Sequence, residues 1–281
     1  MTTERAAPQA PGQTQTRYAV HDGAAWVTLD RPEARNALSA TLVDELYAHV
    51  AAALDDGGVR SIVITGAGSA FCAGADLKNP PGRAGEGEGA ARPVPYAELL
   101  RTLWHSPKPV IAAVNGSAFA GGLGLVGAAD VVVAAESAVF SFSEVRIGVI
   151  PAIISVVCLP KLGAHHAMRL FLGGHRFDGR EAVAVGLAHR AVPAEQLADA
   201  VVEEVESIRL GGPEAIAECK RLVRAIDRLD LDRAFDIAGE WSRLRFESAE
   251  AAEGMAAFRE KRPPRWAAPP PEAATGEADE P

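Results

Sequence analysis

The stretch KPVIAAVNGSAFAGGLGL, residues 108–125, decides the fold of this chain. Its first half, KPVIAAVNG, is a short apolar run typical of a strand buried inside a parallel sheet. The paired glycines Gly121 and Gly122 follow and open a helical segment. Amides at such a helix start point outward with a partial positive charge, which suits an oxygen atom that becomes negative. The same glycines would also let the helix pack closely on the sheet, and both roles can hold.

The same alternation of strand and helix recurs on both sides of this stretch. The runs AAWVTL (24–29), RSIVITG (60–66) and DVVVAA (130–135) predict further buried strands. Helical periodicity covers residues 39–53, which begin with a serine that can cap the helix, and residues 96–104. These patterns predict an α/β domain.

Helices dominate after about residue 163, with starts near Pro193, Pro213 and Ser248. Both ends of the chain are rich in Pro, Ala and polar residues, so we expect them to be disordered. The Pro- and Gly-rich residues 79–94 predict a long loop, either a functional lid or a plain surface insertion. The expected organisation is an N-terminal tail over 1–16, an α/β core over 17–200, a helical C-terminal region over 201–262 and a tail over 263–281.

The composition limits the possible classes of function. The net charge is −9 and the Lys and Arg residues are scattered, which argues against a nucleic-acid or membrane surface. Cys72, Cys158 and Cys219 form no CxxC pair, so we expect neither disulfides nor a metal site. The polar N-terminus lacks the apolar stretch of a signal peptide, and no run is long enough to span a membrane. We expect a cytoplasmic protein that binds neither nucleic acid nor membrane.

Two other segments carry residues suited to chemistry. FCAGADLK, residues 71–78, follows a predicted strand, and its small residues would let a ligand approach backbone amides. FSFSEVRIGVIPAIIS, residues 140–155, holds one carboxylate, Glu144, among apolar and small residues. Burial raises the pKa of a carboxyl group, which would let Glu144 exchange protons near neutral pH. An ion pair with Arg146 is the ordinary alternative.

The glycine-rich helix start also matches G-x-G-x-x-G, at Gly122, Gly124 and Gly127. With Glu144 further on, this spacing is close to that of a dinucleotide-binding fingerprint. In that fingerprint the acidic residue ends the next strand, whereas Glu144 lies beyond it, and residues 115–120 separate the preceding strand from the glycines. Because this interpretation also leaves FCAGADLK unexplained, we do not favour it.

The motifs together resemble the crotonase, or enoyl-CoA hydratase/isomerase, family from about Val20 to Trp266. The resemblance implies the crotonase fold, an α/β spiral of ββα units with a helical C-terminal trimerisation region. It also implies an enzyme that acts on acyl-coenzyme A thioesters and has no prosthetic group. Six landmarks occur in the order of the family, namely RPEARNALS (31–39), FCAGADLK, KPVIAAVNGSAFAGGLGL, FSEVRIGVIPA (142–152), KLGAHHAMRLFLGG (161–174) and EGMAAFREKRPPRW (253–266).

The resemblance also assigns roles to individual residues. The amides of Ala75 and Gly121 match the family's oxyanion hole, and Glu144 matches the second of its two catalytic glutamates. The terminal helices of the family exchange between subunits, which implies a homotrimer or homohexamer. The positions that match the coenzyme A site, the last two on the terminal helix and often supplied by a neighbouring subunit, are Asn36, Ala37, Leu38, Ala73, Asp76, Leu77, Lys78, Phe258 and Lys261.

Gly124 stands where the family's first glutamate would be. This departure argues against hydration by two glutamates, so Glu144 would act in turn as base and acid. Residues 140–155 look closest to bacterial hydratases related to 3-methylglutaconyl-CoA hydratase, some of which also lack the first glutamate, so we favour an enoyl-CoA hydratase. A 3-enoyl-CoA isomerase, a thioester or carbon–carbon hydrolase, and a non-catalytic acyl-CoA binding protein stay open.

Overall fold

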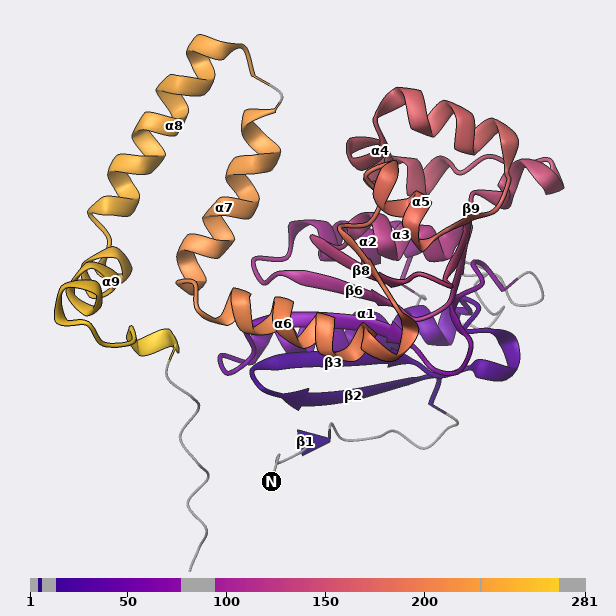
Figure 1. Ribbon diagram of the computed structural model, residues 1–281, viewed down its shortest axis with the longest axis horizontal. Helices are drawn as coiled ribbons and strands as arrows, with labels where there is room; N and C mark the ends of the chain where they lie inside the picture. Colours follow the sequence, from indigo (N-terminus) through magenta and orange to yellow (C-terminus); the bar gives the residue numbers. More distant parts are fainter. Residues whose placement is uncertain (1–4, 7–13, 77–93, 228, 268–281) are drawn as a thin grey trace, which may run out of the picture.

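The computed structural model describes residues 5–6, 14–76, 94–227 and 229–267. Two sheets form the centre of the molecule, and helices cover them (Figure 1). The larger sheet has the strand order β1-β2-β3-β4-β6-β8-β11, and the smaller one has the order β10-β9-β7-β5. Strands β3, β4, β6, β8 and β11 are parallel, as are β5, β7 and β9.

The bounds of the strands and helices are as follows. The larger sheet contains β1 (Arg5–Ala6), β2 (Thr16–His21), β3 (Ala24–Leu29), β4 (Ser61–Gly66), β6 (Val110–Val114), β8 (Val131–Ala135) and β11 (Arg190–Val192). The smaller sheet contains β5 (Ala70–Cys72), β7 (Ser117–Phe119), β9 (Val139–Ser141) and β10 (Phe177–Asp178). The α-helices are α1 (Ala40–Asp55), α2 (Tyr96–His105), α3 (Gly121–Ala128), α4 (Ala152–Gly173), α5 (Gly179–Ala184), α6 (Leu197–Arg209), α7 (Pro213–Ile226), α8 (Leu231–Phe246) and α9 (Ala249–Glu260). Short 3-10 turns are η1 (Pro32–Ala34), η2 (Ser143–Ile147), η3 (Ala194–Gln196) and η4 (Arg265–Ala267).

The chain repeats one unit in a spiral. Strand β4 enters the larger sheet, β5 enters the smaller sheet and α2 follows; β6, β7 and α3 repeat this order, and β8, β9 and α4 repeat it again. Each repeat therefore places a strand-to-helix turn at the end of a strand of the smaller sheet. The turns after β5, β7 and β9 become neighbours because these three strands pair with one another.

The larger sheet is apolar on both faces because helices cover both. Along β4, Ile62 and Ile64 belong to the main core, whereas Val63 points to the opposite face and packs with Val201 and Val205 of α6. A strand buried on both faces appears in the sequence as a continuous apolar run, so RSIVITG was readily predicted. The predicted helix over 39–53 is also confirmed: α1 begins after Ser39, whose side chain accepts a hydrogen bond from the Leu42 amide at 3.1 Å.

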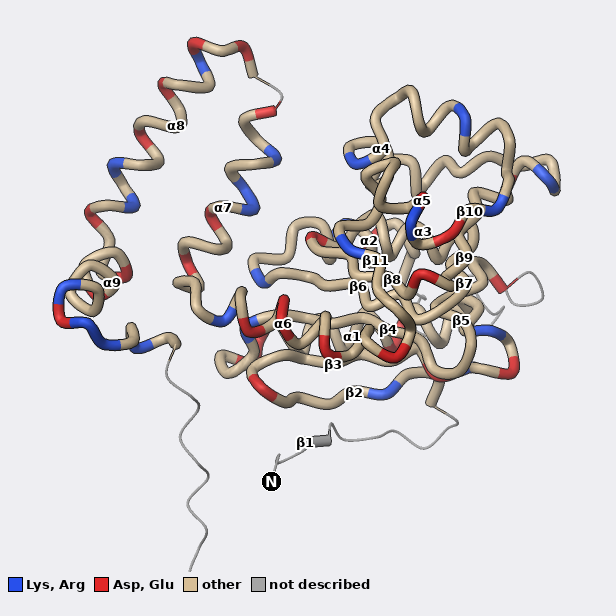
Figure 2. Tube along the Cα trace, viewed as in Figure 1, with Lys and Arg blue, Asp and Glu red and all other residues tan. Residues whose placement is uncertain are grey.

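Helices α7, α8 and α9 extend away from the two-sheet core (Figure 1). Both basic and acidic residues occur along α7 and α8 (Figure 2). Large apolar side chains are nevertheless exposed on this arm, and they are Val223, Leu231, Phe235, Leu244, Phe246, Met255 and Phe258. Within the described residues, no helix is long and apolar enough to cross a membrane.

The expected segment boundaries differ from the structure in detail. The boundary placed at residue 200 falls inside α6. Of the expected C-terminal tail, residues 263–267 are ordered, because the Trp266 indole donates to the Leu210 carbonyl at 3.1 Å and Arg60 donates to the Trp266 carbonyl. Of the expected N-terminal tail, Arg5–Ala6 pairs with β2, and Thr16 begins that strand. Residues 1–4, 7–13 and 268–281 lie outside the described part of the chain.

One buried ion cluster fastens the arm to the core. The Asp130 carboxylate, directly before β8, lies 2.6 Å from the Lys220 ammonium and 2.8 Å from the Arg224 guanidinium, both on α7. Arg224 also stacks over the Trp104 ring of α2. Burial lowers the pKa of Lys220, and the Asp130 charge opposes that shift. The cluster therefore depends on Asp130 to compensate two buried cations.

We predict that Asp130→Ala destabilises the protein by about 3–5 kcal/mol, because it leaves two buried cations without their partner. Urea unfolding followed by circular dichroism measures this change. Glu240→Ala, which breaks an exposed pair with Arg243 on α8, is the control and should leave the urea midpoint nearly unchanged. Equal midpoints for the two variants would show that the cluster does not hold α7.

Candidate active site

Two backbone turns meet at the ends of β5 and β7. Gly74 has a φ of +91°, which favours glycine, and it lies so close to the next turn that an added Cβ would be 2.8 Å from the Phe119 carbonyl oxygen and 3.2 Å from the Gly121 nitrogen. A side chain at position 74 would therefore separate the two turns. The small residues of FCAGADLK allow this close approach.

The amides of Ala75 and Gly121 lie side by side at this junction. A Cβ built on Gly121 would be 3.5 Å from the Ala75 nitrogen. Neither amide donates a hydrogen bond to another described residue. Ala120, just before Gly121, has a φ of 45° and a ψ of −118°, a strained conformation for a residue with a Cβ. That conformation turns the chain from β7 into α3 and leaves the first amide of the helix free.

The turn at residues 36–38 fixes the Ala75 amide from the other side. The Leu38 amide donates to the Gly74 carbonyl at 2.8 Å, and the Asp76 amide donates to the Leu38 carbonyl at 3.0 Å. This parallel bridge bonds the groups on both sides of Ala75 and leaves its own amide unused. Arg31 supports the bridge, because its guanidinium donates to the Ala37 carbonyl and pairs with the Asp76 carboxylate at 3.2 Å.

The side chain of Asn36 is fully engaged within the protein. Its amide nitrogen donates to the carbonyls of Ala67 and Ala70, and its oxygen accepts from the Arg31 amide. Asn36 is completely buried and has a left-handed φ of 56°. The Asn36 side chain therefore supports the turn at residues 36–38 from within the protein.

Glu144 lies on η2, directly after β9, the strand that pairs with β7. Its Oε2 atom is buried and has no hydrogen-bond partner among the described residues. Burial raises the pKa of the carboxyl group above its ordinary value. The ion pair with Arg146, the ordinary alternative, does not form; Arg146 instead donates to the Gly173 carbonyl at 2.8 Å. A half-buried carboxylate with one unpaired oxygen can accept and return a proton.

Gly124 has no room for a side chain. A Cβ there would lie 2.6 Å from the Tyr96 Oη, 2.8 Å from the Ile154 Cγ2 and 3.1 Å from the Leu100 Cδ1. Tyr96 and Leu100 belong to α2, and Ile154 belongs to α4. The place that a first glutamate would need is therefore filled by side chains from two other helices.

The other glycines of the G-x-G-x-x-G match serve packing. A Cβ at Gly122 would lie 2.4 Å from the Cys72 carbonyl oxygen, and one at Gly127 would lie 2.7 Å from the Cys158 Sγ. Burial raises the pKa of each of these thiols to about 12, so both stay protonated at neutral pH. Cys72 is therefore a small packing residue beside the junction and lacks the thiolate that a nucleophile needs.

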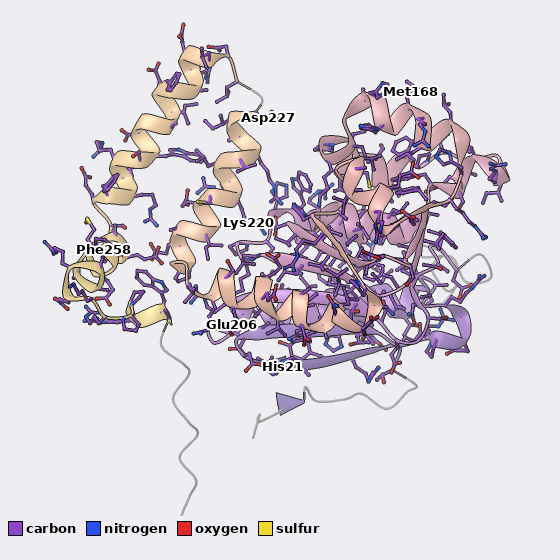
Figure 3. All side chains as sticks on the ribbon, viewed as in Figure 1. His21, Met168, Glu206, Lys220, Asp227 and Phe258 are labelled. Atoms are coloured by element: carbon purple, nitrogen blue, oxygen red, sulfur yellow. The ribbon has the colours of Figure 1, made fainter. Side chains whose placement is uncertain are left out.

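The remaining predicted site residues fall into two groups. Leu77 and Lys78 lie outside the described residues, together with most of the loop predicted at 79–94. Phe258 and Lys261 lie on α9 and at its end, in the arm that extends away from β5, β7 and α3 (Figure 3). The Phe258 side chain is 86% exposed. One chain therefore does not bring these two residues to its own junction.

Sequence reasoning missed the part that Tyr96 plays in the site. The periodicity at 96–104 placed Tyr96 on the core face of a helix, but gave no sign that its hydroxyl reaches α3. The hydroxyl donates to the Gly121 carbonyl at 2.5 Å. The only signal of this contact in the sequence is Gly124, which stands where the family has a glutamate. A glycine at that position leaves space that a side chain from another helix can fill.

Comparison with known proteins identifies the class. A family model described as enoyl-CoA hydratase/isomerase matches residues 20–269. The probable enoyl-CoA hydratase of Rhodobacter capsulatus is 36% identical over 259 residues, which cover 89% of this chain and 96% of that protein. The carnitinyl-CoA dehydratase of Proteus mirabilis is 35% identical over 254 residues, which cover 85% of this chain and 93% of that protein. The crystal structure of an enoyl-CoA hydratase/isomerase from Marinobacter aquaeolei has a TM-score of 0.80 and 32% identity, and the match covers 90% of this chain and 99% of that chain.

The chain therefore belongs to the enoyl-CoA hydratase/isomerase family. The predicted crotonase fold is confirmed, with its spiral of ββα units and C-terminal helices. The protein is an enzyme of this family, whose substrates are coenzyme A thioesters.

The crowding around Gly124 yields a stability prediction. We predict that Gly124→Ala destabilises the protein by about 1–3 kcal/mol, because the new methyl group overpacks against Tyr96 and Ile154. Thermal unfolding measures the change. Gly239→Ala on α8, where a Cβ meets nothing within 4 Å, is the matched control and should be neutral or stabilising. A Gly124→Ala protein as stable as the wild type would contradict the packing described here.

Proposed function

We propose that the enzyme hydrates the α,β double bond of an enoyl-CoA thioester. The amides of Ala75 and Gly121 hold the thioester oxygen, and Glu144 transfers the protons. The observation that carries the proposal is that two unpaired amides and one carboxylate with a buried, unpaired oxygen follow neighbouring parallel strands. Burial is the main cause that raises the pKa of Tyr96, whose hydroxyl bonds to Gly121, and the charge of Glu144 adds to that shift.

The chemistry needs only one carboxylate. The ionised Glu144 takes a proton from water as the water oxygen bonds to the β-carbon, and the electrons of the double bond move onto the thioester oxygen. The two amides stabilise the resulting enolate, because they donate hydrogen bonds where the charge develops. Glu144, now protonated, then returns the proton to the α-carbon. The product is a 3-hydroxyacyl-CoA.

A 3-enoyl-CoA isomerase is the second candidate, and Gly124 is the observation that favours it. Isomerisation requires one group that removes a proton from the α-carbon and returns it to the γ-carbon, and no second carboxylate to position water. The same oxyanion hole serves both reactions, since both proceed through an enolate. The two candidates therefore differ only in whether water enters the site.

The remaining assignments extend the proposal to coenzyme A and to the assembly. The main chain at Asn36, Ala37 and Leu38, and at Ala73, Asp76, Leu77 and Lys78, holds the coenzyme A moiety. A neighbouring subunit supplies Phe258 and Lys261, within a homotrimer or homohexamer that acts in the cytoplasm. The exposed apolar side chains on α7, α8 and α9 support this arrangement, because contacts between subunits would bury them.

The reaction is tested by incubation with a panel of enoyl-CoA thioesters in ¹⁸O-labelled water. The panel includes straight-chain 2-enoyl and 3-enoyl substrates. It also includes 3-methylglutaconyl-CoA, because the sequence of residues 140–155 resembles hydratases related to 3-methylglutaconyl-CoA hydratase. We expect label at the β-carbon of the product, detected by mass spectrometry. A shifted double bond without label would establish the isomerase, and release of free acid would establish a hydrolase.

The role of Glu144 is tested by Glu144→Gln, which keeps the size of the side chain and removes the exchangeable proton. We expect kcat to fall by about 10²- to 10⁴-fold. Burial raises the Glu144 pKa, so wild-type kcat/KM should fall with decreasing pH through a pKa above the ~4.3 of an exposed glutamate. Glu203→Gln, on the exposed face of α6, is the control and should keep full activity. Full activity of Glu144→Gln on a verified substrate would place the proton donor elsewhere.

The assembly is tested by sedimentation and by subunit mixing. We expect a mass of three or six chains. We also expect a mixture of Glu144→Gln and Lys261→Ala chains, unfolded and refolded together, to recover activity at low substrate concentration that neither variant has alone. Recovery follows because a neighbour with intact Lys261 completes the site of a chain with intact Glu144. If the protein is a monomer, or if the mixture is no more active than the two variants alone, then Phe258 and Lys261 do not belong to a neighbouring subunit's site.

A further inference from the structure

Helix α3 begins without the usual supports of a helix N-terminus. Its N-cap residue, Ala120, offers no side-chain acceptor and is held in a strained backbone conformation. Four of its eight residues are glycine, the residue that favours helix least apart from proline. The first turn therefore needs support from outside the helix to keep the Gly121 amide in place.

Tyr96 supplies that support from α2. Its hydroxyl donates to the Gly121 carbonyl at 2.5 Å. Gly121 is the first residue of α3, so this hydrogen bond fastens the first turn of the helix to α2.

Gly124 makes room for the Tyr96 hydroxyl beside α3. The Tyr96 Oη lies 2.6 Å from the place where a Cβ of residue 124 would be, so a side chain there and the phenol exclude each other. The absence of the first glutamate and the presence of Tyr96 are therefore one structural feature, in which a phenol from α2 occupies the space beside α3.

We infer that Tyr96 is a positioning residue, whose hydroxyl holds the first turn of α3 so that the Gly121 amide points at the thioester oxygen. The inference rests on the proposed oxyanion hole and adds to it the group that orients one of its donors. Burial raises the pKa of Tyr96 well above its ordinary value, so the phenol stays protonated and acts as a fixed donor. Its proton is directed at Gly121, which leaves proton transfer to Glu144.

The experiment measures carbonyl polarisation without turnover. Butyryl-CoA labelled with ¹³C at the thioester carbonyl is bound to the full-length enzyme, and isotope-edited infrared difference spectra report the C=O stretch. In the wild type we expect a shift to lower wavenumber, because the two amides polarise the bond. Tyr96→Phe should reduce that shift and lower kcat by between about tenfold and 10²-fold, as expected for a misplaced catalytic donor, with KM nearly unchanged.

Two further variants keep the inference falsifiable. Gly124→Ala displaces the phenol without deleting it, so it should reduce the infrared shift in the same way. Because both changes break one bond, the kcat loss of the Tyr96→Phe/Gly124→Ala double variant should be close to the larger single loss and well below the product of the two. Tyr47→Phe, which removes the hydroxyl of a half-buried tyrosine of α1, is the matched control and should behave like the wild type.

The outcomes separate this inference from the function on which it rests. A wild-type enzyme that does not shift the carbonyl stretch would overturn the oxyanion hole, and the role of Tyr96 with it. A normal wild-type shift that Tyr96→Phe and Gly124→Ala leave unchanged would overturn the role of Tyr96 alone. So would kcat losses that multiply in the double variant.

Discussion

The close approach of two backbone turns, at Gly74 and at Gly121, is the constraint on which the rest of the site depends. Hydrogen bonds of the smaller sheet bring the turns together, since β5 pairs with β7. The absence of a Cβ at Gly74 allows the contact, and its positive φ requires a residue that tolerates it. The Ala75 and Gly121 amides then lie side by side with no partner within the described chain. Two adjacent donors without a protein partner can both hydrogen-bond to one ligand oxygen, which is the arrangement an oxyanion hole needs.

The surrounding structure holds these turns in place. The bridge between Leu38 and Ala75, the Arg31 pair with Asp76, and the buried Asn36 side chain secure the first turn. The phenol of Tyr96 reaches the second from α2. These supports come from two distant parts of the sequence, residues 31–38 and α2, so the site exists only when both are packed against the two turns. Such preorganisation is what an oxyanion hole requires, because donors that must reorient during the reaction stabilise the transition state less.

Much of the fold could be predicted from the sequence, because its strands are buried on both faces and its helices carry ordinary signals. RSIVITG and KPVIAAVNG are continuous apolar runs, and Ser39 is a standard cap for α1. The ordered turn at Arg265–Ala267 could not be predicted, since its order comes from long-range bonds between Trp266, Leu210 and Arg60. Composition alone made that segment look like a tail.

The candidate site was predictable where main-chain motifs define it and unpredictable where side chains cross between elements. FCAGADLK, the paired glycines and Glu144 were found in the sequence, and the structure brings all three to the ends of neighbouring strands. The link between Tyr96 and Gly124 was invisible, because nothing in a sequence reports that a hydroxyl from one helix fills a space beside another. The glycine looked like a loss of function, whereas the structure shows a space that is already occupied.

The most direct measurement is a crystal structure of the enzyme with a bound, unreactive acyl-CoA such as butyryl-CoA. The account predicts that the thioester oxygen lies about 2.7–3.1 Å from both the Ala75 and the Gly121 nitrogen atoms. It also predicts that the Glu144 carboxylate faces the α- and β-carbons. A thioester oxygen bonded to neither amide, or a Glu144 side chain directed away from the acyl chain, would contradict the central claim.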